Sequence, residues 1–297
     1  MEKFAQRLLA CWRDEPLLRA VRCAQGIGNY VFDLTGARGR YILRCSREPA
    51  AYENTVRWLE ELAALYIPVP RVLGHGLFEG WACLLLTRLE GEDLGLVYPR
   101  LTREEKREIV RLVEAIQRKA AALRVWVPPD WRWQDEVTAL LDRAEERIRQ
   151  NGWFDPEKVT RLRRAARELE DYFSAVPPVA YLDDISSKNL LIHEGRVSGI
   201  IDVDWIGVGD RLTYAALTEM ALLDLGYDTD YVTFLLEEMA PTPAQLRAFR
   251  FYTLLYCVDF MGERGMRFLD KQVPVSPEIV DKLERVFSLL WEDWTNG

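Results

Sequence analysis

Acidic and amide side chains around residue 190 follow a pattern that could transfer a phosphoryl group. Asn189 comes five positions after Asp184, and Asp202 follows a further apolar run. The carboxylate of Asp184 can accept a proton from an attacking hydroxyl, whereas Asn189 and Asp202 offer the hard oxygen ligands that Mg²⁺ prefers. Each of these residues alone is also common as a turn cap. It is the joint pattern that predicts phosphoryl transfer.

A predicted β-hairpin explains how these side chains could come together. Residues 190–192 are a short apolar run suited to a buried strand, residues 194–196 supply a turn, and residues 197–203 return as a second strand. We therefore expect Asn189 and Asp202 to lie close to each other.

Two longer stretches around these residues resemble a known family. Residues 183–189 read DDISSKN and residues 199–210 read GIIDVDWIGVGD. Together they resemble the aminoglycoside phosphotransferase family of the protein-kinase-like superfamily, which also includes choline, fructosamine and homoserine kinases. The resemblance implies a small-molecule kinase, a Mg²⁺-dependent enzyme that moves the γ-phosphate of ATP or GTP to a hydroxyl of a small molecule.

The resemblance also implies a role for each residue. Asp184 falls on the catalytic base, and Asn189 and Asp202 fall on the two metal ligands. Asp183 is a competing candidate for the base, but only Asp184 has the five-residue spacing to Asn189. Asp204 occupies an acidic position that is common in the family.

One position departs from the family pattern. The family has His-Gly-Asp where this chain has Leu182, Asp183 and Asp184. The family His organises the catalytic loop by hydrogen bonding and packing, and Leu182 can only pack. The alternative function is therefore a catalytically weak or inactive kinase-like protein that binds nucleotide or acts as a scaffold.

The N-terminal part contains candidates for binding nucleotide phosphates. Gly26, Gly28 and Asn29 form a tight loop whose backbone N–H groups could approach phosphate oxygens, although Gly-x-Gly also occurs in ordinary hairpin turns. Arg44, in the predicted strand 40–45, occupies the place where kinases have a phosphate-binding Lys. Arginine can hold phosphate, although the two residues are not equivalent.

Two further nucleotide-binding features are implied by the resemblance. Glu53 opens a predicted helix over residues 53–66 and aligns with the acidic partner of the phosphate-binding residue, with Glu48 as the second choice. The hinge between the lobes would bind the nucleotide base through the backbone of Arg88, Leu89 and Glu90. Backbone contacts leave no side-chain signature, so ATP and GTP cannot be distinguished here.

Composition and element pattern predict an α+β, protein-kinase-like fold with two lobes. The chain has 297 residues, 49% of them hydrophobic, which is enough for a substantial core. Strand patterns dominate to about residue 87, and long helical patterns follow. We expect a nucleotide-binding lobe over residues 1–88, with a small antiparallel sheet and one helix, and a mostly helical catalytic and substrate-binding lobe over residues 89–297. Residues 1–7 also have an amphipathic helical pattern.

The charge and the cysteines indicate the kinds of partner and the compartment. A net charge of −8 argues against nucleic acid, and no apolar run approaches the length of a membrane span. The five cysteines are odd in number and scattered, without metal-ligand spacing, so we expect reduced thiols in a cytoplasmic protein.

The C-terminal part suggests where the acceptor binds. Acids outnumber bases between residues 224 and 263, and Tyr256, Asp259 and Glu263 follow one helical stripe. Aromatic faces beside carboxylates suit a cationic hydroxylated molecule such as an aminoglycoside. Asp224, Tyr256, Asp259 and Glu263 are the predicted substrate contacts. The alternative is a core stripe whose acids are solvated at its end.

Overall fold

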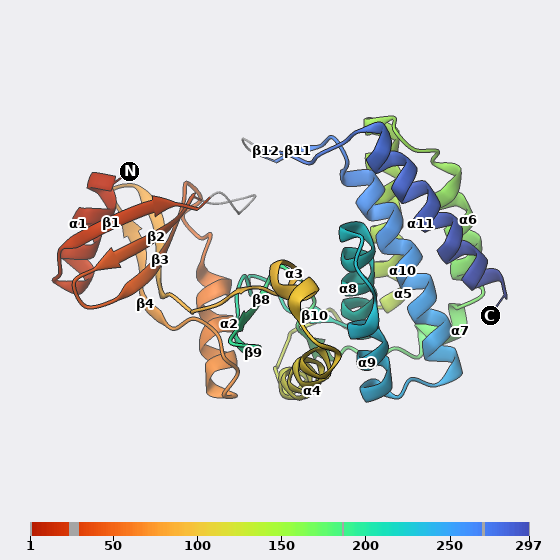
Figure 1. The fold of residues 1–297 in the computed structure, drawn as a ribbon, viewed down its shortest axis with the longest axis horizontal. Helices are drawn as coiled ribbons and strands as arrows, with labels where there is room; N and C mark the ends of the chain where they lie inside the picture. The colour runs from red at the N-terminus through yellow and green to blue at the C-terminus, as the bar shows by residue number, and fades with distance from the viewer. Residues whose placement is uncertain (1, 24–29, 186, 269–270, 297) are drawn as a thin grey trace.

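A small β-sheet lobe and a larger helical lobe make up the chain (Figure 1). The computed structural model describes residues 2–23, 30–185, 187–268 and 271–296. The sheet lies at one end of the molecule, the long C-terminal helices lie at the other, and the β8–β9 hairpin lies between them (Figure 1). The expected α+β, kinase-like architecture is confirmed.

The N-terminal lobe is built on a five-stranded antiparallel sheet. Its spatial order is β1-β2-β3-β5-β4. The strands are β1 (Leu17–Arg22), β2 (Tyr30–Gly36), β3 (Arg40–Ser46), β4 (Val72–Phe78) and β5 (Trp81–Thr87). In this register Arg44 on β3 lies opposite Leu84 on β5.

Two helices cover the two faces of this sheet. The side chains of a strand alternate between its faces, so Leu85 packs with the buried side of α1 (Glu2–Arg13), whereas Leu84 packs with α2 (Glu53–Ala64). The expectation counted one helix in this lobe, and the amphipathic start of the chain adds the second. The α2 side of the sheet belongs to the same hydrophobic cluster as the helical lobe.

The helical lobe contains eight helices of five or more residues within the described ranges. They are α4 (Arg103–Ala120), α5 (Trp133–Asn151), α6 (Glu157–Arg167), α7 (Glu170–Ser174), α8 (Leu212–Leu225), α9 (Asp230–Met239), α10 (Pro243–Glu263) and α11 (Pro277–Asn296). Two single turns, α3 (Leu94–Val97) and η1 (Tyr98–Arg100), connect the lobes. None of the helices described is long and apolar enough to span a membrane.

Short strands carry the region around residue 190. The predicted hairpin is present as β8 (Leu190–His193) and β9 (Arg196–Ile200), with β6 (Glu92–Asp93) beside β8. A second pair joins β7 (Ala180–Tyr181) to β10 (Gly207–Val208), and a third joins β11 (Arg267–Phe268) to β12 (Lys271–Gln272). Because β9 ends at Ile200, Asp202 lies in the loop that follows it.

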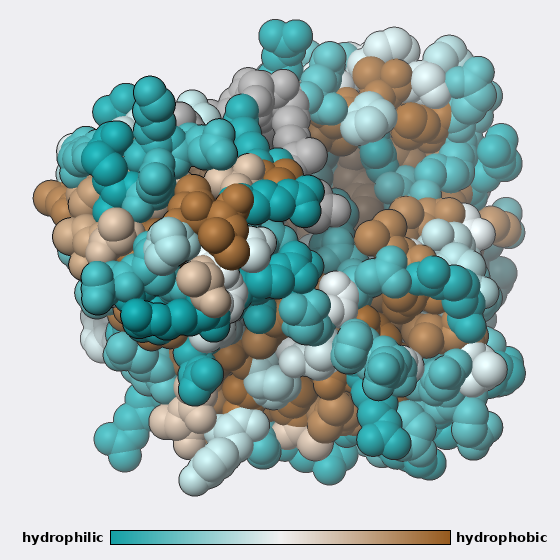
Figure 2. Space-filling view, turned by 60° about the vertical axis from the view of Figure 1, so that its left-hand side comes forward, coloured by the Kyte–Doolittle hydropathy of each residue, from teal (hydrophilic) through white to brown (hydrophobic). Residues whose placement is uncertain are grey.

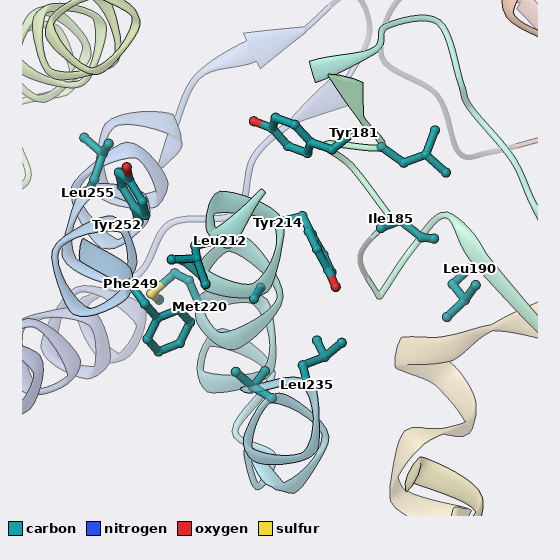
Figure 3. Close-up of a cluster of buried hydrophobic side chains, with 14 of the residues drawn as sticks. Tyr181, Ile185, Leu190, Leu212, Tyr214, Met220, Leu235, Phe249, Tyr252 and Leu255 are labelled. Carbon is teal, nitrogen blue, oxygen red and sulfur yellow. The ribbon is translucent and has the colours of Figure 1, made fainter. Parts of the chain in front are cut away.

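A buried cluster supports the segment between β7 and β8. Tyr181, Ile185 and Leu190 belong to the same cluster as Tyr214 of α8 and Tyr252 of α10 (Figure 3). Each of these side chains is at most 5% exposed. The polar residues between them are thus attached to a packed frame rather than to a free loop.

Candidate active site

Asp184 lies at the surface, on the loop between β7 and β8. The next residue, Ile185, is buried, whereas Asp184 itself is exposed. Asn189 Nδ2 donates a hydrogen bond to the backbone oxygen of Asp184 at 3.0 Å, which closes the loop between them. The backbone oxygen of Asn189 accepts from the N–H of Ile201 at 2.9 Å, which ties the same loop to the end of the hairpin. The structure thus brings together the predicted base and the predicted ligand Asn189.

Gln117 of α4 holds the chain just before this loop. Its side-chain amide donates to the backbone oxygen of Leu182 at 2.8 Å and accepts from the backbone N–H of Leu182 at 2.9 Å. Gln117 is 1% exposed and Leu182 is 3% exposed. Both backbone groups of Leu182 are therefore satisfied in a buried environment, although its own side chain offers no hydrogen bond. Gln117 of α4 therefore fixes the backbone at the position where the family has a histidine.

Asp183 is less exposed than its neighbour Asp184. Its Oδ1 accepts the backbone N–H of Asp184 at 3.0 Å. Burial, and next the negative charge of Asp184, raise the pKa of Asp183 to about 6. Tyr256 of α10 lies nearby, since burial and the charge of Asp183 both raise the pKa of its phenol. Asp183 therefore contributes a carboxyl group beside the predicted base.

Asp202 and Asp204 meet the N-terminal lobe at Arg44. The guanidinium of Arg44 donates to both oxygens of Asp204, at 2.8 and 2.5 Å, and lies 3.5 Å from Asp202 Oδ1. Thr55 of α2 also donates to Asp204, at 2.7 Å. This arrangement links the sheet, α2 and the loop after β9 through a single carboxylate.

The expected pair between Arg44 and Glu53 is not formed in the structure. Glu53 is exposed at the first turn of α2, and no ion pair joins it to another residue of the described ranges. The acidic partner of Arg44 is instead Asp204, and α2 contributes the hydroxyl of Thr55. The side chain of Arg44 is only 10% exposed, so a buried cation there requires a close carboxylate, which the loop after β9 provides.

The donor set around Asp202 fits a magnesium ion. The bond from Asn189 Nδ2 to the Asp184 backbone leaves the amide oxygen as the end of that side chain suited to a cation. Asp202 lies near Asp184 and Asp204: burial chiefly raises the pKa of Asp202, those two charges raise it further, and Arg44 opposes them. A carboxylate and an amide oxygen near further negative charge are the ligands that Mg²⁺ prefers. Asp202 also has a φ of +59°, an unusual backbone conformation for a residue other than glycine.

The predicted nucleotide contacts are only partly described. Gly26, Gly28 and Asn29 lie outside the described residues. Arg88 directly follows β5, and its guanidinium pairs with Asp33 at 2.8 Å and with Glu90 at 2.9 Å. Leu89 packs so closely on Gly199 that a Cβ there would lie 2.2 Å from Leu89 Cδ1. The hinge is thereby held against β9, while its contacts with a nucleotide base stay a prediction.

Asp224, one of the four predicted acceptor contacts, forms ion pairs with residues of the C-terminal part of the chain. Asp224 pairs with Arg264 at 2.7 Å and with Lys282 of α11 at 2.9 Å, and these partners hold the pKa of its carboxyl below its usual range against the effect of burial. These two ion pairs join the end of α8 to α11 and to the residue that follows α10. The role of Asp224 as an acceptor contact stays a prediction, and an acceptor cation there would have to share the carboxylate with Arg264 and Lys282.

Tyr256, Asp259 and Glu263 share one side of α10, and Tyr256 and Glu263 lie within electrostatic range of Asp183 and Lys188, respectively. Both acids of this set are paired with arginines. Arg147 of α5 lies 3.3 Å from Asp259 and 3.4 Å from Glu263, and Arg143 lies 3.5 Å from Asp259. The sequence offered two alternatives for this stripe, an acidic surface that binds a cationic acceptor and a core stripe with solvated acids, and neither describes this arrangement fully. The acids are neither free to bind cations nor simply solvated.

The sequence of this chain matches a known protein family over most of its length. The profile described as the phosphotransferase enzyme family, APH, matches residues 19–218. The chain belongs to this family. Membership confirms the resemblance drawn from the two motifs and the enzyme class of phosphotransferase.

Individual relatives are more distant. An aminoglycoside 3'-phosphotransferase from Streptomyces fradiae is 26% identical over 269 residues, covering 85% of this chain and 89% of that protein. The crystal structure of the aminoglycoside phosphotransferase APH(4)-Ia has a TM-score of 0.67 at 16% identity and covers 100% of this chain and 99% of that one. A putative fructosamine-3-kinase from Haemophilus somnus has a TM-score of 0.64 at 14% identity and covers 98% of this chain and 97% of that one. At such identities the two structures support the fold alone.

Four residues of the site were not found from the sequence. Gln117 and Thr55 are polar residues inside amphipathic helices, and nothing in their local pattern indicates a partner in the other half of the chain. Arg143 and Arg147 stand one turn apart on α5, which is a surface pattern in any charged helix. A distant pairing of this kind becomes visible only when the helices are placed.

Proposed function

We propose that this protein is a Mg²⁺-dependent phosphotransferase that moves the γ-phosphate of ATP, or of GTP, to a hydroxyl of a small molecule. The observation that supports it most is the arrangement of the catalytic loop. Asp184 is exposed, Asn189 is bonded to its backbone, and Asp202 lies near enough for the charge of Asp184 to raise its pKa. Membership of the phosphotransferase family supports the same reaction type.

The chemical work proposed for the chain is mainly positioning. Asp184 would orient the acceptor hydroxyl and take its proton as the oxygen bonds to the γ-phosphorus and the bond to the leaving nucleoside diphosphate breaks. Because the transition state of phosphoryl transfer is loose, most of the acceleration should come from alignment and electrostatics. Mg²⁺ held by Asn189 and Asp202 would offset phosphate charge. We therefore expect the rigidity of the loop to contribute more to the rate than the basicity of Asp184.

The nucleotide would bind between the lobes. The proposed contacts are the loop containing Gly26, Gly28 and Asn29, the guanidinium of Arg44 and the hinge backbone of residues 88–90. In the structure Arg44 is engaged by Asp204, so its proposed contact with phosphate requires donors to be shared between the two. We extend the proposal to the cytoplasm as the site of the reaction, which the scattered free cysteines favour.

The rival function is an inactive nucleotide-binding scaffold, which Leu182 favoured at the level of the sequence. The hydrogen bonds from Gln117 to the backbone of Leu182 weaken that argument, because they hold the loop without a histidine side chain. Asp184, Asn189 and Asp202 are all present, so the proposed base and both proposed metal ligands are retained.

Nucleotide turnover tests the proposal. Wild-type protein with Mg²⁺ and either ATP or GTP is assayed against sugars, polyols, amino alcohols and aminoglycosides, beside Asp184→Ala and a control, Asp171→Asn, at an exposed acid on α7. We expect acceptor-dependent turnover that Asp184→Ala removes and the control retains. Turnover retained in Asp184→Ala would refute the assignment of the base. No turnover at all, together with thermal stabilisation by Mg²⁺-nucleotide, would favour the scaffold.

A further inference from the structure

The surface of α10 that faces the catalytic loop is electrically balanced. Asp259 contacts two arginines of α5, Arg143 and Arg147, and Arg147 also reaches Glu263. The side chain of Asp259 is 12% exposed and that of Arg147 is 20% exposed, so this pair is largely withdrawn from water. A carboxylate in such a pair is not available to a second cation without losing the first.

The balanced surface lies beside the predicted base. Burial and the charges of Asp183 and Asp259 raise the pKa of Tyr256, so both carboxylates lie within electrostatic range of this phenol. Lys188, an exposed residue of the same loop, lies close enough to Glu263 to lower its pKa against the larger effect of burial. Both ends of this charge cluster therefore lie within electrostatic range of the loop that carries Asp184.

The charges can be counted directly. The bases are Arg143, Arg147 and Lys188, and the acids are Asp183, Asp184, Asp259 and Glu263. Three positive and four negative charges sum to −1 when every acid is ionised and to zero when Asp183 is protonated. Figure 2 shows that the face of the molecule seen there carries both hydrophilic and hydrophobic patches and has a hollow near its middle. A net charge between zero and −1 in this set is small against the several ammonium groups of a polycation.

We propose that the acceptor is an uncharged hydroxylated molecule, such as a sugar or polyol, and that Arg143 and Arg147 exclude polycationic acceptors. This inference rests on the proposed phosphotransferase function and narrows its acceptor. A neutral polyhydroxyl compound can exchange hydrogen bonds with paired carboxylates and guanidinium groups without breaking the pairs. A polycation must either displace the arginines or approach them, and like charges brought together without solvent are strongly unfavourable.

Substitution of the two arginines tests this inference. Arg143→Gln and the double variant with Arg147→Gln remove positive charge while keeping polar side chains of similar length. The matched control is Arg149→Gln on the same helix, where Arg149 pairs with Glu145 and its side chain is 61% exposed. Affinity for kanamycin, as the polycation, is measured by calorimetry at low ionic strength, and kcat/KM is measured for neutral sugars and polyols and for kanamycin.

We expect wild-type protein to bind kanamycin weakly and to transfer phosphate to neutral acceptors in preference. Each arginine removed should raise the affinity for kanamycin by on the order of tenfold, an effect that added salt suppresses, whereas Arg149→Gln should leave it unchanged. If the double variant does not fold, Arg143→Gln alone decides, because the Arg143 side chain is 47% exposed and makes one contact at 3.5 Å.

The failure of this inference differs from failure of the proposed function. Tight kanamycin binding by the wild-type protein, or an affinity that the arginine substitutions do not change, would overturn the inference even if Asp184-dependent phosphate transfer is observed. Absence of transfer to every acceptor would count against the proposed function, and the kanamycin titrations would still decide the charge of the site.

Discussion

Replacing Gln117 with leucine should damage the catalytic loop without touching any group at its surface. Leucine is close to glutamine in size, so no large cavity forms, but the buried N–H and C=O of Leu182 both lose their partner. An unsatisfied buried polar group costs about 1–3 kcal/mol, so the two together set a range of about 2–6 kcal/mol. Because the loop can shift and admit water, we expect the free energy of unfolding to fall by about 2–4 kcal/mol.

The same change should lower turnover more than nucleotide binding. If about 1.4–2.7 kcal/mol of that loss appears as poorer alignment of Asp184 in the transition state, kcat falls about 10–100-fold. The nucleotide is proposed to bind through the N-terminal lobe and hinge, so its KM should change little. Urea unfolding followed by circular dichroism gives the stability, and steady-state kinetics at a fixed acceptor concentration separate kcat from KM.

Two comparison variants make this prediction specific. Gln117→Glu can donate and accept as glutamine does only while its carboxyl is protonated, so its kcat relative to wild type should recover as pH is lowered. Gln150→Leu on α5 removes an exposed glutamine whose side chain, within the described residues, donates one hydrogen bond, to Glu146 on the same helix. This control should change neither quantity. Wild-type kcat and stability in Gln117→Leu would refute the view that this amide positions the loop.

Two further changes test other parts of the structure. Asp204→Asn should lower the free energy of unfolding by about 2–3 kcal/mol, because buried Arg44 loses its main carboxylate while Asp202 stays within reach. Thr55→Val removes one hydrogen bond to Asp204 and should lower it by only about 1 kcal/mol. Equal effects of the two substitutions in urea unfolding would contradict this prediction. Glu219→Gln should stabilise the protein at high pH and not at low pH. Burial raises the pKa of Glu219 to about 7 from the ordinary 4.5, so the stability associated with its protonated form is complete below pH 4.5 and is lost as pH rises through 7. At pH 9 the free energy of unfolding of Glu219→Gln should exceed that of wild type by about 2–3 kcal/mol, since one pKa unit corresponds to about 1.4 kcal/mol. Melting curves that show the same difference between variant and wild type at pH 4.5 and at pH 9 would refute this prediction.

The parts of the site that were predictable are local in sequence. The hairpin β8–β9 follows from an apolar run, a turn and a second apolar run, and a short hairpin must bring its two ends together. The spacing of Asp184, Asn189 and Asp202 along the chain therefore already predicts that their side chains lie close together. The capping box of α4, in which Thr102 and Glu105 bond reciprocally, is another local signal of this kind.

Partners that come from different elements were not predictable. Glu53 was the reasonable acidic partner for Arg44, since it opens the next helix, yet Asp204 takes that place from the other lobe. Asp224 and Asp259 have the same residue type and similar surroundings in sequence, but one pairs with Arg264 and Lys282 and the other with the arginines of α5. Charge in a sequence does not reveal which charges remain unpaired after folding.

The sequence by itself determined the family, and with it the reaction class and the architecture of this protein, because the two motifs that indicate the family lie within one hairpin and its flanking loops. Only the tertiary structure decided how the loop between β7 and β8 is held and which acids of α10 are paired. Gln117 reaches Leu182, and Arg147 reaches Asp259, across more than sixty and more than one hundred positions of the chain, respectively. Contacts of that separation depend on how helices pack, and packing is set by the whole hydrophobic core rather than by any local pattern.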